Sequence, residues 1–172
     1  MSSYHTHAAG PGAETVPALG KVIIENLAQA TAEVFETMVF RSLETGNPIE
    51  GEALRPGSNV VGTIGFAGSS SGLVAFYSTL ATAREITGAM LGMSPDEVNG
   101  EIPDAIGEIT NMVAGSFRTR MAQEGDAWAI SVPTVTMGSD FYIKPMTNGR
   151  RVLLPFRMGE HEVFVELILT KS

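Results

Sequence analysis

The chain has 172 residues and a formal net charge of −8, with 44% apolar and 17% charged residues. This composition is typical of one globular domain with a substantial core, and the absence of cysteine excludes a disulfide framework and thiol catalysis. The few basic residues are scattered, which argues against nucleic acid as a partner, and no apolar run approaches the roughly 18 residues of a membrane span. A chain without cysteine suits the cytoplasm, where we expect this protein.

The first twenty residues predict a flexible N-terminal leader, 1–20, followed by a single domain over 21–172. The leader is rich in small residues and proline, and it has no Lys or Arg before Lys21, so it lacks the charged start of a signal peptide. Apolar residues at helical spacing then predict a helix from Ile23 to Leu43, which the following Gly-Asn-Pro should end.

The middle of the chain predicts a hairpin and a second helix. Asn59 to Ala67 and Gly72 to Ser78 carry β-type residues, and we expect them to pair across a longer turn of glycine and serine. Thr79 to Leu91 then repeats apolar residues at helical spacing, and Gly92 marks the C-terminal end of this helix.

The last third of the chain predicts β structure after a third helix. Trp128 to Met137 gives one or two strands around Pro133, Phe141 to Lys144 a short strand, and Val152 to Arg157 a hairpin with Glu162 to Thr170. The last strand is apolar on one face, so it could supply an edge for a homodimer or lie centrally in its own sheet. The order αββααβββ predicts an α+β fold with helices packed on a largely antiparallel β-sheet.

The third helix, from about Ile102 to Gln123, has an unusual exposed face. At about 100° per residue, one polar stripe holds Asp104, Glu108, Asn111, Gly115 and Arg118. Asn and Gly are poor helix formers, and a face that only serves solubility more often carries Glu, Lys, Gln and Arg. Glu108 and Asn111 stand side by side, and Gly115 leaves a gap where another surface could approach. Such breaks of local preference mark functional sites, although two polar residues on a solvated helix remain the simpler interpretation.

Other candidate sites are weaker. His5 and His7 lie in the leader and His161 lies at a turn, so their separation argues against a metal site. A Ser-His-Asp set is not predicted, because His161 has no evident ordered partner. Glu33 and Glu36 on the first helix are interpreted as part of its solvated face.

The stripe on the third helix resembles the motif of a known family. Asp104-x-x-x-Glu108-x-x-Asn111, with Pro133 downstream, is similar to the signature of the CheC/CheX/FliY family of chemotaxis phosphatases. The run from Asp104 to Gly115 is most similar to the CheX branch. Two further stretches are also CheX-like: Val34-Phe-Glu-Thr-Met38 and Gly62-Thr-Ile-Gly-Phe-Ala-Gly68. The resemblance covers about residues 21–170.

Two departures from the family pattern change what it implies. The first helix has no Glu-x-x-Asn, because Glu33 is followed by Glu36, so the resemblance implies one active centre, as in CheX and unlike two-site CheC. The spacing from Asn111 to Pro133 is one residue shorter than in the CheC-type signature. We therefore assign Pro133 only a structural role.

The resemblance implies a phosphatase that hydrolyses the aspartyl phosphate of a CheY-like response regulator. The regulator would supply the phospho-Asp, a Mg²⁺ and a Lys, so this chain would need no cofactor or metal of its own. Asn111 would orient the attacking water, since an amide cannot act as a general base at neutral pH. Glu108 would pair with the regulator's active-site Lys, and Asp104, Gly115 and Arg118 would border the partner.

Two other functions stay open at this point. The first is a non-catalytic module that binds response regulators, as in the related middle domain of the flagellar switch protein FliM, which lacks the catalytic pair. The second is a structural or sensory interaction domain that leaves the lifetime of any aspartyl phosphate unchanged. The presence of both Glu108 and Asn111 favours the phosphatase.

Overall fold

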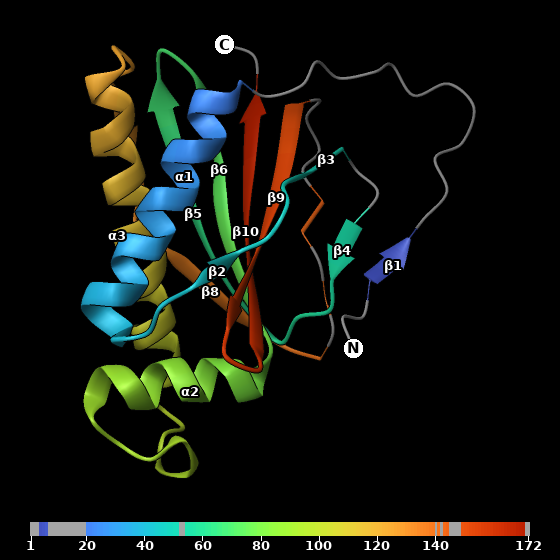
Figure 1. Ribbon diagram of the computed structural model, residues 1–172, viewed down its shortest axis with the longest axis vertical. Coiled ribbons are helices and arrows are strands. Elements are labelled where there is room, and N and C mark those ends of the chain that lie inside the picture. The colour runs from blue at the N-terminus through green and yellow to red at the C-terminus, as the bar shows by residue number, and fades with distance from the viewer. Residues whose placement is uncertain are drawn as a thin grey trace.

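The computed structural model describes residues 4–6, 20–51, 54–139, 141, 143–144 and 149–170. In this part of the chain, three α-helices pack on an antiparallel sheet of eight strands, which confirms the predicted α+β fold (Figure 1). The helices are α1 (Lys21–Val34), α2 (Leu80–Leu91) and α3 (Ile102–Gln123). The helices α1 and α3 lie side by side on one face of the sheet, and α2 crosses its lower end in Figure 1.

The sheet has the strand order β2-β9-β10-β6-β5-β7, with β3 added beside β9 and β8 beside β5. Its strands are β2 (Glu44–Thr45), β3 (Ile49–Glu50), β5 (Val60–Gly68), β6 (Ser71–Ser78), β7 (Trp128–Ile130), β8 (Thr134–Met137), β9 (Gly149–Met158) and β10 (His161–Thr170). Both predicted hairpins are confirmed, as β5–β6 and β9–β10, although only Ser69 and Ser70 separate β5 from β6. The expected longer turn is therefore a tight one.

The last strand lies in the middle of the sheet. Phe164 in β10 is opposite Tyr77 of β6 on one side and Pro155 of β9 on the other. The hypothesis that this strand supplies a free edge for a homodimer is therefore wrong. Both faces of β10 are buried, and a strand buried on both faces gains most from backbone partners on both edges.

The first helix ends earlier than its sequence pattern predicts. After α1 the chain forms a π-helical turn, Phe35–Val39, and Phe40 then adopts a left-handed φ of 60°. The Phe40 N–H donates to the Phe35 carbonyl and closes the turn, so Leu43 lies outside the helix. A left-handed conformation is uncommon for a bulky residue and leaves no recognisable pattern in a sequence.

Two predicted segments differ from the structure in part. The described residues of the expected strand Phe141–Lys144, which are 141, 143 and 144, lie in no strand. Instead, Phe141 and Ile143 pack against the face of the sheet away from the main core, where they cover apolar side chains. In the predicted leader, Tyr4–Thr6 forms β1 and pairs with β4 (Leu54–Pro56), and residues 1–3 and 7–19 lie outside the described part of the chain.

A buried carboxylate lies on the sheet face opposite the helices. Glu166 accepts a hydrogen bond from the Tyr77 hydroxyl at 3.0 Å and an ion-pair contact from Arg151 Nη2 at 2.7 Å. The side chains of Glu166 and Arg151 are only 5% and 12% exposed. Burial raises the pKa of Glu166 despite the opposing charge of Arg151, and burial followed by the Glu166 charge raises the pKa of Tyr77.

The stability of the protein should depend on pH through Glu166. The raised pKa means that the folded state keeps a proton that the unfolded chain releases near its ordinary value of 4.5. This contribution is complete below the unfolded pKa and is lost as pH rises through the folded pKa. Glu166→Gln cannot titrate, so the wild-type unfolding free energy minus that of the variant should fall as pH rises above the ordinary glutamate pKa of 4.5. Parallel denaturant titrations check this, and a difference that grows with pH contradicts it.

Candidate active site

Helix α3 is anchored to the sheet by its apolar face. The anchoring side chains are each at most 1% exposed and comprise Ile102, Ile106, Ile109, Val113 and Phe117. Thr110 packs directly over Gly62 of β5, where a Cβ would overlap the Thr110 hydroxyl, so only glycine allows the helix so close to the strand. At the start of α3, the Asn99 N–H donates to the Glu101 carboxylate at 3.0 Å and lowers its pKa. This packing fixes which face of α3 meets solvent.

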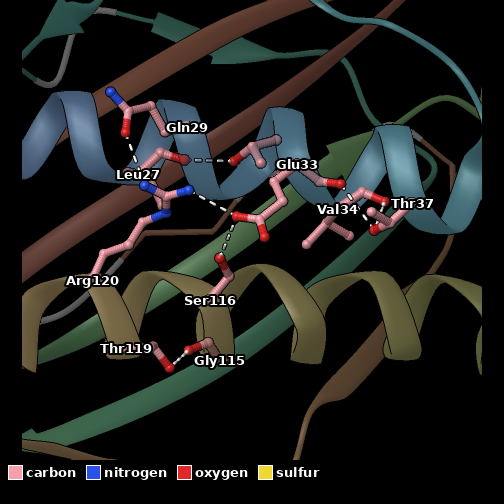
Figure 2. Close-up of polar contacts among 10 residues, drawn as sticks. Leu27, Gln29, Glu33, Val34, Thr37, Gly115, Ser116, Thr119 and Arg120 are labelled. Carbon is pink, nitrogen blue, oxygen red and sulfur yellow. Dashed lines mark hydrogen bonds and ion pairs between the residues drawn. The ribbon is translucent and has the colours of Figure 1, made fainter.

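Polar contacts fix α3 against α1 (Figure 2). The two terminal guanidinium nitrogens of Arg120 donate to Glu33 and Gln29: Nη2 lies 2.7 Å from Glu33 Oε2 and Nη1 lies 2.8 Å from Gln29 Oε1. Ser116 Oγ also donates to Glu33 Oε2, at 3.5 Å. Glu33 is therefore a bridging residue between the helices rather than part of a purely solvated face, whereas Glu36 is exposed as predicted. No local pattern in the sequence identifies Arg120 as a bridging residue, because its partners lie 87 to 91 residues away.

The polar stripe of α3 lies at the surface. Asp104, Glu108 and Arg118 are exposed, and Asn111 and Gly115 are half-buried. Within the described residues, the side chains of Glu108 and Asn111 make no hydrogen bond or ion pair. A Cβ at Gly115 would meet nothing within 4 Å, so internal packing does not require a glycine there. A free carboxylate and a free carboxamide, about 5–6 Å apart at their Cβ atoms, therefore face solvent beside an open backbone position.

The other side of α3 lies against the edge strands β7 and β8. The Phe117 ring packs on the Trp128 ring of β7 with centroids 5.2 Å apart. Ten residues earlier, a Cβ on Gly107 would lie 3.5 Å from Val135 Cγ2 of β8. Between the two strands, Val132 is 85% exposed, a feature that sequence reasoning missed because Pro133 signalled only an interruption.

His161 has ordered partners, contrary to the sequence analysis. Its Nδ1 lies 3.1 Å from the Thr82 hydroxyl and its Nε2 lies 3.9 Å from Glu85. Thr82 is only 3% exposed, so its hydroxyl is not accessible to a substrate, and the three residues tie α2 to the β9–β10 turn. Among the described residues, no group of three or more His, Cys, Asp or Glu could hold a metal ion. None of the described helices is long and apolar enough to span a membrane.

Comparison with known proteins gives the family. A family model described as chemotaxis phosphatase CheX matches residues 60–157, which is more than half of the chain. The chain belongs to the CheX family. The matched region runs from β5 into β9 and contains all of α3, including Glu108 and Asn111.

Relatives of this CheX-family chain match it over nearly its whole length. A Thermotoga maritima protein named CheY-P phosphatase CheX is 27% identical over 151 residues, which cover 87% of this chain and 96% of that protein. A crystal structure of chemotaxis protein CheX from Desulfovibrio desulfuricans has a TM-score of 0.79 at 27% identity, covering 86% of this chain and 98% of that one. The CheX-CheY-BeF3-Mg complex from Borrelia burgdorferi contains a chain with the same fold, with a TM-score of 0.73 at 20% identity over 87% and 98% of the two chains.

The two helices that border the surface of this CheX-family chain differ in the availability of their carboxylates. Glu33 on α1 is held by Arg120 and Ser116, whereas Glu108 on α3 has no partner within the described residues. A carboxylate that is already paired must break that contact before it binds another cation, and an unpaired carboxylate does not. Of these two carboxylates, only the one on α3 is therefore available to bind another cation without breaking a contact.

Proposed function

We propose that this chain is a phosphatase that hydrolyses the aspartyl phosphate of a CheY-like response regulator. The observation that carries the proposal is the unpaired Glu108 and Asn111 on the exposed face of α3, in a chain of a chemotaxis phosphatase family. Two relatives support it: the Thermotoga maritima protein is named a CheY-P phosphatase, and the Borrelia burgdorferi complex joins CheX to CheY with BeF3 and Mg²⁺. Because response regulators act in the cytoplasm, we place the chain there.

Asn111 is the positioning group in this mechanism. Phosphoryl transfer depends mainly on in-line placement of the nucleophile and on electrostatic stabilisation. The Asn111 carboxamide accepts a hydrogen bond from water through its oxygen and donates through its nitrogen, so it can hold the attacking water in line with the phosphorus. Its neighbours in the stripe leave it accessible, because the Gly115 position, one turn further along, is open.

Glu108 sets the docking register. An exposed carboxylate without a partner can form a charge-assisted hydrogen bond to the active-site Lys of the regulator. The regulator supplies the phospho-Asp and Mg²⁺, and this chain supplies no metal. Asp104, Gly115 and Arg118 lie on the same stripe and border the partner. If two copies pair through a sheet edge, the remaining edges are those of β7–β8 and β2–β3.

Glu108→Ala tests the docking role. The variant should raise the KM for the phosphorylated regulator by about tenfold, with a smaller change in kcat, because a hydrogen-bonded ion pair at an interface contributes to binding. The measurement is phosphate release from a panel of phosphorylated receiver domains, which also identifies the substrate. Glu124→Ala is the matched control: Glu124 is an exposed carboxylate directly after the C-terminal end of α3, about 24 Å from Glu108 along the helix axis, and should behave as wild type.

The outcomes separate the proposed function from the FliM-type alternative. Accelerated phosphate release by the wild-type chain supports the phosphatase, and a KM change in Glu108→Ala alone supports the assigned docking contact. Binding to phosphorylated regulators without any acceleration of phosphate release would instead support a non-catalytic binding module. An equal loss in the Glu108 and Glu124 variants would contradict the local role of Glu108.

A further inference from the structure

The segment between β7 and β8 holds a large apolar side chain in solvent. Val132 is 85% exposed, which is the highest exposure of any large hydrophobic residue in the described part of the chain. Single exposed valines are common on protein surfaces, so exposure alone identifies no function. The backbone around Val132 and its place relative to α3 provide two further observations.

Ser131 builds a bulge that holds this segment out of the sheet. The Ser131 N–H donates to the Gly65 carbonyl at 2.8 Å, and its hydroxyl accepts the Gly65 N–H at 2.9 Å. The same hydroxyl donates to the Val132 carbonyl at 3.1 Å. The Ser131 hydroxyl thus accepts the hydrogen bond that the Ser131 carbonyl would accept in a regular antiparallel ladder. Regular pairing with β5 resumes only at Thr134. Bulges at sheet edges redirect side chains, and they occur often beside active sites.

The bulge also protects this part of the edge from pairing with another strand. The Val132 carbonyl already accepts the Ser131 hydroxyl, and Pro133 has no N–H to donate. An added strand could therefore not form a regular ladder of backbone hydrogen bonds across residues 131–133. Val132 offers a side-chain contact rather than an edge for strand addition.

The bulge lies alongside α3 at the level of Asn111. Phe117 contacts Trp128 at one end of this stretch, and Gly107 faces Val135 at the other. The helix and the edge strands therefore run in opposite directions between these two anchor points. Asn111 lies between Gly107 and Phe117, and Val132 lies between Trp128 and Val135. A partner that covers Asn111 meets the bulge next.

We propose that Val132 is an apolar docking contact for the response regulator, next to the polar pair and separate from it. This inference rests on the proposed function, and it assigns Val132 to binding and not to chemistry. The regulator face that surrounds the phospho-Asp would place an apolar side chain against Val132. Because burial of a valine side chain corresponds to about a tenfold change in a dissociation constant, Val132 contributes to affinity and to the choice between regulators.

Val132→Ser tests the inference in the full chain. With the phosphorylated regulator that the wild type dephosphorylates, KM should rise by about tenfold and kcat should stay within about twofold. Val132→Ile should keep the wild-type KM. Val22→Ser is the matched control, because Val22 is 50% exposed at the start of α1, where α1 lies beside the far end of α3, and this variant should change neither constant.

The outcomes distinguish the inference from the proposed function. If the wild type accelerates phosphate release and Val132→Ser retains the wild-type KM, the inference fails and the proposed function stands. If the wild type does not accelerate phosphate release from any phosphorylated regulator, the proposed function fails and the inference fails with it. If light scattering shows that Val132→Ser dissociates a dimer while KM is unchanged, Val132 contacts a second copy of this chain, which overturns the assignment to the regulator.

Discussion

Asn111→Ala should lower the kcat for the phosphorylated regulator by about 10²-fold or more, by analogy with the loss of one positioned polar group at other active sites. The amide of Asn111 has no partner within the described residues, so its removal disturbs no internal contact. Alanine is also a better helix former than asparagine, so α3 should remain intact. Single-turnover phosphate release at saturating regulator measures the effect on the chemical step.

Gln123→Ala provides the control for this change. Gln123 carries the same functional group, is exposed, and lies about 18 Å further along α3. This variant should retain wild-type kcat and KM. Asn111→Ala with wild-type turnover at saturation would exclude water positioning by this side chain, even if the KM changed.

Glu166→Ala should lower the free energy of unfolding by about 3–5 kcal/mol, because it leaves the buried Arg151 guanidinium without its counter-charge. The Tyr77 hydroxyl loses its acceptor as well. Denaturant unfolding at neutral pH measures the loss. Replacing both members of the pair, with Arg151→Met and Glu166→Leu, should recover much of the stability, since two apolar side chains leave no unpaired charge.

Glu44→Ala is the matched control, since burial is the main difference between the two ion pairs. Arg157 Nη2 and Glu44 Oε2 are also 2.7 Å apart and also join residues of the same sheet, but their side chains are 65% and 73% exposed. Exposed pairs contribute about 0–1 kcal/mol, so this variant should unfold close to wild type. Equal losses in Glu44→Ala and Glu166→Ala would contradict the role assigned to burial.

Local patterns predict the elements that carry local signals. The apolar repeats of α2 and α3, Gly92 after α2, and the alternation in β10 predict those elements within a few residues of their observed ends. The exposed stripe with Glu108 and Asn111 follows from the same periodicity. These features depend on side chains that lie near one another in the chain.

Features that depend on distant residues are not predictable in this way. The central place of β10 is decided by β6, whose residues pair with it across about ninety positions. The ion pair of Arg120 with Glu33 and the hydrogen bonds between Ser131 and Gly65 likewise join distant segments. The left-handed Phe40 ends the π-helical turn after α1, where no glycine marks the position. In each case tertiary packing determines the structure, and local sequence propensity does not predict it.

The contact between Arg120 and Glu33 limits how this protein could acquire a second centre. Glu36→Asn would create Glu-x-x-Asn across the end of α1 and the π-helical turn that follows it, with the same spacing as the motif on α3. Its carboxylate, however, would still be Glu33, which Arg120 holds at 2.7 Å and Ser116 also contacts. A designer would have to release Arg120 first, and α1 would then lose polar contacts that seat it against α3. Creating a second motif is thus one step, and freeing its carboxylate to bind a partner is another. The second step conflicts with the packing of the two helices.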